Sequence, residues 1–173
     1  MLPTIVAQGI KRPLREVFPG RLRKARRALG ISASALSDAA CLGRGSVFLM
    51  EGGKRLPRIS TVVRLAAVLQ VPPALLAFGD RRALAGTPDA GGLPARLVEA
   101  RAALGMPQRD IERRTGIATS TVRALEEGGE PTLDTVEALA EVLAVSPAWL
   151  AFGMGDRELL RRGARRAAAA PAP

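Results

Sequence analysis

The residue types that most often carry out catalysis or bind metals are scarce in this sequence. It contains no histidine, which excludes Ser-His-Asp and Cys-His catalysis and HExxH metal sites. Its single cysteine, Cys41, allows neither an internal disulfide nor a zinc finger, and we interpret it as a small apolar residue in a reducing compartment. The stretch Gly43-Arg44-Gly45 begins like a GxGxxG phosphate loop but lacks the third glycine. We therefore expect no catalytic residue, no metal and no cofactor.

Binding of a polyanion is the chemistry that the sequence favours instead. The chain has 26 Lys and Arg residues against 16 Asp and Glu residues, a formal net charge of +10 over 173 residues. Such a charge indicates a polyanionic partner. A few carboxylates lie close together in the second half of the chain, namely Glu126, Glu127, Glu130 and Asp134. We interpret them as a helix end and a solvated face, which disfavours an enzyme that relies on carboxylates.

Nothing in the sequence points to a membrane. No stretch approaches the roughly 18 unbroken apolar residues of a membrane span, and the N-terminus lacks the apolar core of a signal peptide. Apolar residues make up 47% and charged residues 24% of the chain, as in ordinary soluble domains. We expect a cytoplasmic, nucleoid-associated protein.

The sequence repeats itself, and the repeat supplies the elements that must position the charged residues. Residues 21–30 align with residues 96–105, an offset of 75 positions that persists to Gly53 and Gly128. One residue is then lost, and residues 73–79 align with residues 147–153 at an offset of 74. We infer two copies of one domain of about 60 residues.

The two copies divide the chain into five segments. These are a basic N-terminal arm (1–19), a first domain (20–79), a linker that we expect to be flexible (80–92), a second domain (93–153) and an Arg/Ala-rich C-terminal tail (154–173). The spacing of apolar residues predicts five helices in each copy and no strand. In the second copy, Thr119 and Thr132 are expected to cap two of them.

A short helix, a tight turn with glycine and a second short helix form a helix-turn-helix. The second copy carries this pattern in residues 105–111, 115–122 and 125–128, followed by a closing helix over 136–143. On these residues the chain resembles the phage-repressor, or XRE/Cro-type, helix-turn-helix family. The resemblance covers both copies and implies an all-α fold of two tandem five-helix, lambda-repressor-like helix-turn-helix domains.

In that family, the helix beginning at Thr119 would be the recognition helix that enters the major groove of DNA. Its groove-facing residues would be Thr119, Ser120, Thr121 and Arg123, because hydroxyls reach base edges or phosphates and arginine can bond guanine through both its acceptors. Gln108 matches the family's glutamine at the start of the preceding helix, which braces phosphate or base. The alternatives are a capping role for Thr119 and a solvated face for the other three helix residues.

In the first copy the matching positions hold less ordinary residues, namely Arg44, Gly45, Ser46, Phe48 and Leu49. A glycine inside a helix costs about 1 kcal/mol relative to alanine, unless DNA approaches the backbone of Gly45. Phe48 and Leu49 could contact thymine methyl groups, or they could form an apolar patch that binds protein. The sequence favours neither reading of this pair.

Two pairs of opposite charges match structural ion pairs of the resembled family. Arg26 with Glu51, and Arg101 with Glu126, would tie the first helix of each copy to its recognition helix. We expect these four residues to stabilise the fold, because removing one partner of a buried pair leaves the other charge uncompensated.

The two copies differ in charge. Residues 20–79 carry ten basic and two acidic side chains, whereas residues 93–153 carry six and nine. Because phosphate contacts dominate affinity for DNA, charge favours the first copy as the DNA anchor, while the motif favours the second. Lys54, Arg55 and Arg58 follow the first recognition helix, where the family's loop runs along the DNA backbone and a basic residue can enter the minor groove.

Two arrangements use both copies. In one, the chain is a covalent pseudo-dimer that reads sites about one helical turn apart on one face of DNA. In the other, the first copy binds DNA and the second is a dimerisation module, with Trp149, Leu150 and Phe152 as candidate contacts. Double-stranded DNA is the expected partner, a second copy of the chain is a further candidate, and no membrane is expected.

The function that these observations favour is that of a sequence-specific double-stranded DNA-binding transcriptional regulator. Repression is favoured over activation, because blocking a promoter requires only tight binding and the sequence shows no obvious sensor domain. The alternative is a protein-binding adaptor, such as an antiactivator or an antitoxin-like protein, built on a repurposed helix-turn-helix unit.

Overall fold

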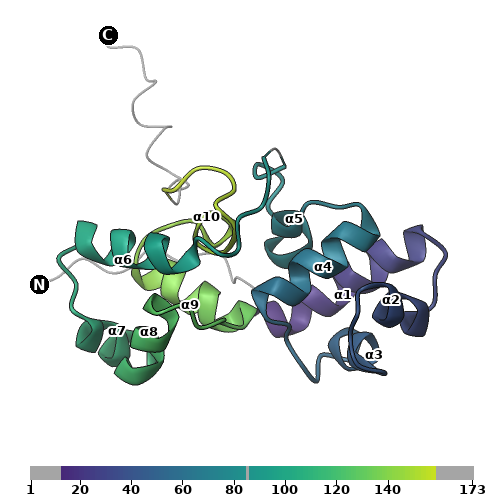
Figure 1. Cartoon of the computed structure of the whole chain (residues 1–173), viewed down its shortest axis with the longest axis horizontal. Coiled ribbons are helices and arrows are strands. Elements are labelled where there is room, and N and C mark those ends of the chain that lie inside the picture. Colours follow the sequence, from purple (N-terminus) through teal and green to yellow (C-terminus); the bar gives the residue numbers. More distant parts are fainter. Residues whose placement is uncertain (1–12, 85, 159–173) are drawn as a thin grey trace, which may run out of the picture.

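The computed structural model describes residues 13–84 and 86–158, and most of these residues are helical (Figure 1). The first copy contains α1 (Leu14–Ala28), α2 (Ala33–Ala39), α3 (Ser46–Glu51), α4 (Ile59–Leu69) and α5 (Pro73–Phe78). The second copy contains α6 (Leu93–Ala103), α7 (Gln108–Thr115), α8 (Thr119–Glu126), α9 (Leu133–Val142) and α10 (Pro147–Phe152). These helices, with no β-strand in the described ranges, confirm the all-α fold of two tandem five-helix domains.

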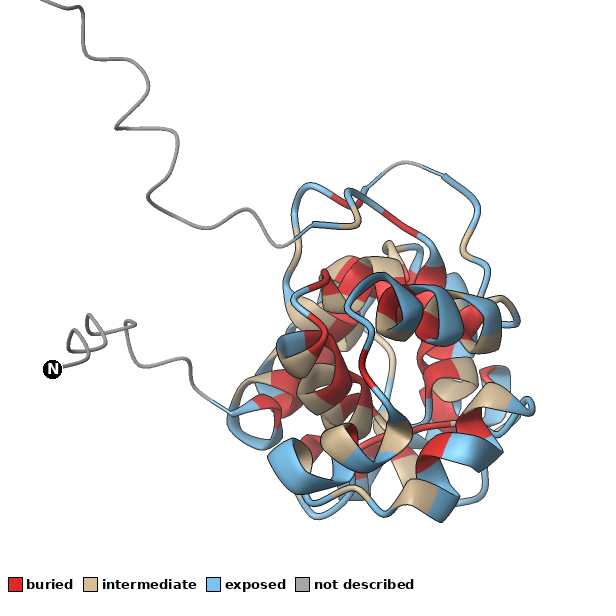
Figure 2. Cartoon of the chain, turned by 90° about the vertical axis from the view of Figure 1, so that its left-hand side faces the viewer, coloured by how far each residue is buried: buried red, intermediate tan, exposed pale blue. Residues whose placement is uncertain are grey.

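Apolar residues at helical spacing bury one face of the longer helices. In α4 the side chains of Val62 and Leu65 are fully buried, and the equivalent Val136 and Leu139 of α9 are fully buried as well. Each such side chain contributes about 1.5–3 kcal/mol when it leaves water. Figure 2 shows the buried residues, in red, on the inward sides of the helices, while the outward sides remain exposed.

The first helix begins earlier than the sequence suggested. Residues 14–19, which we expected to belong to the basic arm, form the first turns of α1. Leu14 and Phe18 lie about one turn apart on this helix and are both buried, so the core draws this segment into the helix. Arg15 is therefore a helix residue, whereas Lys11 and Arg12 lie outside the described residues.

Parts of the segment between the copies, which composition predicted to be a flexible linker, are held by hydrogen bonds and burial. The N–H of Asp89 donates to the carbonyl of Phe152 at 2.9 Å, and its carboxylate accepts bonds from the N–H of Gly92 and from Arg96. Ala83 is buried. Asp89 therefore links the start of α6, through its carboxylate, to the end of α10, through its backbone N–H.

Residues 154–158, which we placed in the C-terminal tail, pack against the second copy. Met154 is buried, and the carbonyl of Arg157 accepts a 2.8 Å hydrogen bond from the N–H of Ser146. The guanidinium of Arg157 also lies over the ring of Trp149, 5.2 Å from its centroid. The second domain therefore extends beyond residue 153, and residues 159–173 lie outside the described part of the chain.

The two copies meet through equivalent residues. The N–H of Ile59 donates to the carbonyl of Pro131 at 3.2 Å, and the N–H of Leu133 donates to the carbonyl of Pro57 at 3.1 Å. Pro57 and Pro131 are equivalent, as are Ile59 and Leu133, each pair being 74 positions apart. Each bond is thus the counterpart of the other, which is the pattern of a two-fold symmetric dimer interface.

The last helices of the two copies continue this contact. Helices α5 and α10 pack on each other, and the rings of Phe78 and Phe152 lie 6.1 Å apart at an angle of 47°. These two phenylalanines are again equivalent. Leu150 and Phe152 are fully buried, so neither is free to contact a second chain. Leu150 and Phe152 thus pack within the chain, whereas the third candidate for dimerisation, Trp149, is only partly buried.

Side-chain contacts across the junction do not follow the symmetry. Glu130 accepts a 2.7 Å hydrogen bond from the N–H of Ser60 at the start of α4, and its other oxygen lies 3.9 Å from Arg58. Arg15 on α1 donates to Asp134 on α9 at 3.1 Å. The basic first copy thus supplies the cations and the acidic second copy supplies the carboxylates.

Candidate nucleic-acid interface

Helix α3 carries Ser46, Phe48 and Leu49, three of the residues predicted to face the DNA groove in the first copy. We call α3 and the equivalent α8 the reading helices. The side chains of Val47 and Met50 and the carboxylate of Glu51 are buried, whereas Phe48 is 68% and Leu49 is 38% exposed. Successive residues of a helix are rotated by about 100°, so Phe48 and Leu49 share the side opposite the buried residues. The outward face of α3 is therefore apolar.

Gly45 lies before α3 and not inside it, in contrast to the expectation from the sequence. Its φ of 80° is left-handed, a conformation that strains residues with a Cβ atom. A Cβ atom at Gly45 would meet no other atom within 4 Å. The backbone conformation alone therefore favours glycine here, and α3 begins at Ser46, with Arg44 exposed just before the turn.

Helix α8 presents the reading positions of the second copy and begins earlier than α3. Thr119 is its first residue, whereas the first residue of α3, Ser46, is equivalent to Thr121. Ser120, Thr121 and Arg123 are exposed, and Thr119 is half-buried. Hydroxyl groups and one guanidinium thus line the outward face of α8.

Thr119 does not cap α8 with its own side chain. Its hydroxyl donates to a carboxylate oxygen of Glu112 on α7, and its N–H donates to the same oxygen at 3.2 Å. These two hydrogen bonds lower the pKa of Glu112, first through the hydroxyl and then through the N–H. A carboxylate of the preceding helix therefore accepts a hydrogen bond from the first N–H group of α8, at the helix end where the dipole favours negative charge.

Both candidate ion pairs are formed. Arg26 Nε lies 2.6 Å from Glu51 Oε1 and its Nη2 lies 3.0 Å from Oε2, while the same atoms of Arg101 and Glu126 are 2.7 and 3.2 Å apart. The Glu51 and Glu126 side chains are only 9% and 12% exposed. Bonding to Glu51 raises the pKa of Arg26. Such two-pronged contacts fix α3 to α1 and α8 to α6.

Gln108 takes part in this network and not only in a surface for DNA. Its Nε2 donates to Glu126 Oε2 at 2.7 Å, so the amide donor that we assigned to a phosphate or base is engaged within the protein. In the first copy, Ala33 stands at the equivalent position and cannot bond. There, Arg23 contacts the glutamate instead: its Nε lies 3.6 Å from Glu51 Oε2, and its Nη2 donates to the backbone carbonyl of Glu51 at 2.7 Å.

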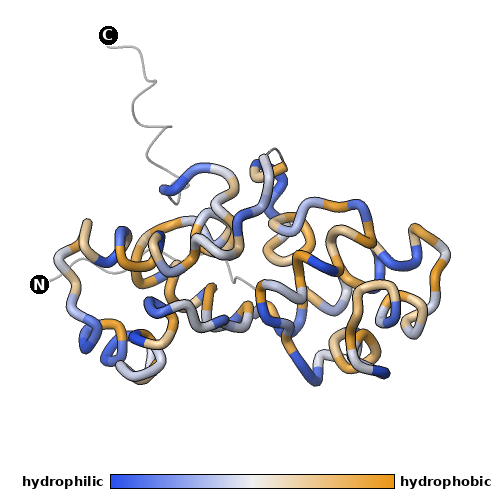
Figure 3. Tube along the Cα trace, in the orientation of Figure 1, coloured by the Kyte–Doolittle hydropathy of each residue, from blue (hydrophilic) through white to orange (hydrophobic). Residues whose placement is uncertain are grey.

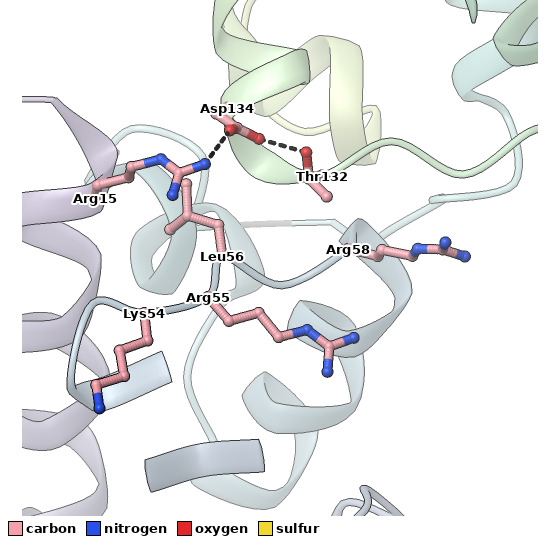
Figure 4. A pocket seen from close by; sticks show the side chains of 7 residues that line it. All are labelled: Arg15, Lys54, Arg55, Leu56, Arg58, Thr132 and Asp134. Atoms are coloured by element: carbon pink, nitrogen blue, oxygen red, sulfur yellow. Dashed lines mark hydrogen bonds and ion pairs between the residues drawn. The ribbon is translucent and has the colours of Figure 1, made fainter. Parts of the chain in front are cut away.

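The loop after α3 carries three exposed cations. Lys54, Arg55 and Arg58 are exposed, and with Arg15 they surround an open hollow of about 340 Å³ that also contacts Leu56, Thr132 and Asp134 (Figure 4). Figure 4 shows the Arg55 and Arg58 side chains pointing away from the Arg15–Asp134 pair. The equivalent loop of the second copy is uncharged or acidic, with Gly128, Gly129, Glu130 and Thr132.

Asp134 is the carboxylate of this hollow. Burial by itself would raise its pKa, but hydrogen bonds from Thr132, Arg15 and the N–H of Thr135 keep the pKa below its usual value. It therefore remains charged and pairs with Arg15, while the loop cations Lys54, Arg55 and Arg58 are exposed at the same hollow, Arg58 lying 3.9 Å from Glu130.

The reading helices and the loop cations lie on one side of the molecule. Figure 1 shows α3 and α8 at the lower edge, towards opposite ends, with the chain between α3 and α4 running between them. Residues 80–84 lie at the opposite edge. The arrangement presents two separated helices and a cationic loop to a common surface, as expected for contact with an elongated polyanion.

Comparison with known proteins agrees with this geometry. The helix-turn-helix family HTH_3 matches the chain twice, over residues 22–76 and 97–150. No curated protein and no solved structure matches it. In the described ranges, no helix has both the length and the apolar character needed to cross a bilayer, and no cluster of His, Cys, Asp and Glu suits a metal ion.

Proposed function

Because the chain belongs to the helix-turn-helix family HTH_3 through both of its copies, we propose that it is a sequence-specific double-stranded DNA-binding regulator that uses both copies at once. The observation that carries this proposal is the reciprocal pair of backbone bonds joining residues 57 to 133 and 131 to 59. These bonds join the segments that follow α3 and α8 in the pattern of a two-fold symmetric dimer. The chain would then read two sites about one helical turn apart on one face of DNA.

The charges of the junction support a common DNA-facing surface. Lys54, Arg55 and Arg58 belong to the first copy but lie beside the second copy, next to Thr132 and Asp134. Between two half-sites, cations at this place would meet the phosphates or the minor groove of the central base pairs. The cations of the first copy would therefore supply phosphate contacts close to the acidic second copy as well.

We favour repression over activation for this regulator, acting in the cytoplasm on the nucleoid. A protein that covers two adjacent turns of a promoter excludes other proteins by occupancy alone. In vitro transcription from a promoter that contains a footprinted site would test this point. Lower transcript levels on addition of the protein are expected, and higher levels would overturn repression.

DNA binding itself is tested by gel shifts on genomic fragments between about 50 and 200 mM salt. In a plot of the logarithm of the binding constant against the logarithm of the salt concentration, each phosphate contact steepens the slope by about 0.9. The variant Arg44→Glu with Arg58→Glu should abolish the specific shift. The matched control is Arg81→Glu with Arg82→Glu, which changes net charge equally at exposed residues of the opposite edge. No specific shift at low salt, or equal loss in both variants, would contradict the proposal.

The exposed Phe48 supports a second candidate, a protein-binding adaptor that uses α3 as its docking helix. Under this reading the Arg44→Glu and Arg58→Glu variant keeps its biological function, while Phe48→Ala loses it. Under the DNA reading, the charge-reversed variant loses function.

A further inference from the structure

The two reading helices are held symmetrically but differ in chemistry. Resting on the proposed function, we infer that the chain binds a non-palindromic operator in one fixed orientation, with Phe48 and Leu49 of α3 contacting thymine 5-methyl groups in one half-site. The other half-site would be read by the hydroxyls and the guanidinium of α8. This assigns the specificity of each half-site to different residues of one polypeptide.

The apolar face of α3 is the first observation behind this inference. Phe48 is the most exposed large apolar residue among those described, and Leu49 beside it is exposed as well. Figure 3 shows α3 mostly in orange, at the edge that faces away from the rest of the chain. The only apolar feature that DNA offers to a helix in the major groove is the methyl group of thymine.

The charges around this face select DNA as its occupant. Arg44 lies just before α3 and Lys54 just after it, and both are exposed. The copy that contains them carries ten basic and only two acidic side chains over residues 20–79. When these cations reach phosphates on either side of the groove, Phe48 and Leu49 lie between them, against the base edges.

The corresponding face of α8 has the opposite character. Arg123 and Ala124 stand at the positions of Phe48 and Leu49, and both are exposed. A guanidinium at this place recognises guanine through two hydrogen bonds, and does not distinguish thymine from uracil. Glu112 of α7, which bonds the start of α8, and Glu127 after the end of α8 add negative charge. The second copy therefore depends on base contacts more than on phosphate contacts.

The junction turns this chemical difference into a fixed direction. In a symmetric dimer either subunit can take either half-site, so the operator is a palindrome. Here the two helix-turn-helix copies are parts of one chain. The bonds between residues 57 and 133 and between residues 131 and 59 fix their relative position. Each of the helices α3 and α8 therefore meets its own half-site. Reversing the operator would present the wrong bases to both helices.

The experiment begins by selecting binding sites for the whole chain from a random double-stranded library. A motif without dyad symmetry, with thymine at fixed positions in one half, is the expected result. Each thymine is then replaced by deoxyuridine, which removes only the methyl group. The protein should lose about three- to five-fold in affinity at each contacted thymine, from the transfer energy of one methyl group.

Two variants assign the contacts. Phe48→Ala should bind the selected site more weakly and should no longer respond to deoxyuridine at the thymine that Phe48 contacts, while a thymine that Leu49 contacts keeps its response. Arg123→Ala should keep that response and instead lose discrimination for guanine in the other half. Both side chains are exposed, so neither change disturbs the core.

A palindromic motif would overturn the fixed orientation, and a non-palindromic motif that tolerates deoxyuridine everywhere would overturn the role of Phe48. If no sequence is enriched even at low salt, the proposed function itself fails, and Phe48 becomes a docking residue for protein. The outcomes therefore separate failure of this inference from failure of the function on which it rests.

Discussion

Arg58 and Thr132 occupy the same position in the two copies, and their backbones face each other as a short antiparallel bridge. In a homodimer, residues near the two-fold axis meet their own counterparts in the same way. The chain contains this contact internally, with Ile59 and Leu133 completing it. The two copies thus already cover this surface on each other.

We predict that the chain is monomeric in solution and binds its operator with a stoichiometry of one. Light scattering after size exclusion should give the mass of a single 18.1-kDa chain over a range of concentrations. Phe78→Glu should loosen the α5–α10 contact, because it places a charge against the ring of Phe152. A mass of two chains for the wild-type protein would contradict the pseudo-dimer.

Removal of the Glu126 carboxylate should destabilise the protein without removing a DNA contact. Glu126→Ala leaves Arg101 and Gln108 without their shared acceptor, and we expect a loss of about 3 kcal/mol in the free energy of unfolding. Urea denaturation followed by circular dichroism measures this loss. Glu127→Ala is the control, because Glu127 is exposed and lies outside the ion pair. Equal stability of the two variants would contradict a structural role for Glu126.

Gly45→Ala should lower the free energy of unfolding by about 1 kcal/mol, because the left-handed conformation before α3 strains a residue with a Cβ atom. Gly43→Ala is the matched control: its backbone is not left-handed, and an added Cβ would make only an ordinary 3.6 Å contact with Ser46. Thermal unfolding of both variants checks this difference. If alanine is tolerated equally at the two positions, strain does not explain Gly45.

Asp89 should make the start of α6 sensitive to acid. Hydrogen bonds from the N–H of Gly92 and from Arg96 lower the pKa of Asp89, so the folded state holds its proton less tightly than the unfolded state. The stabilisation is therefore complete above the usual carboxyl pKa of about 4 and is lost as the pH falls through the lowered value.

The variant Asp89→Asn tests this dependence. Because the carboxylate is largely exposed, we expect a loss of only about 0.5 kcal/mol at pH 7. The difference in melting temperature between wild type and variant should shrink below the usual carboxyl pKa. A difference that stays constant down to strongly acidic pH would contradict the lowered pKa.

The architecture could be predicted from the sequence because it depends on local patterns. Apolar spacing predicted five helices in each copy, and the repeat supplied the same signal twice. The same local reasoning failed at Gly45, because the sequence does not show that α3 starts later than α8. Phe18 and Leu14 were missed since the basic residues around them suggested an arm.

The contacts between copies could not be predicted, because they join residues far apart in the chain. Glu130 was interpreted as part of a solvated face, yet it bonds the start of α4 and lies near Arg58. Glu112 was likewise unremarkable until α7 placed it at the first turn of α8. Pairing of this kind depends on tertiary packing, for which a single sequence carries no periodic signal.

The reciprocal junction also determines how this protein can change over evolutionary time. In a homodimer, one codon changes both ends of the binding site together. Here a mutation in α3 or in α8 alters one end only, so each can acquire a new preference while the other keeps its target. Residues 57–59 and 131–133 have no such independence, because each backbone bond depends on the counterpart segment. We therefore expect sequence changes to accumulate more readily in α3 and α8 than in residues 57–59 and 131–133.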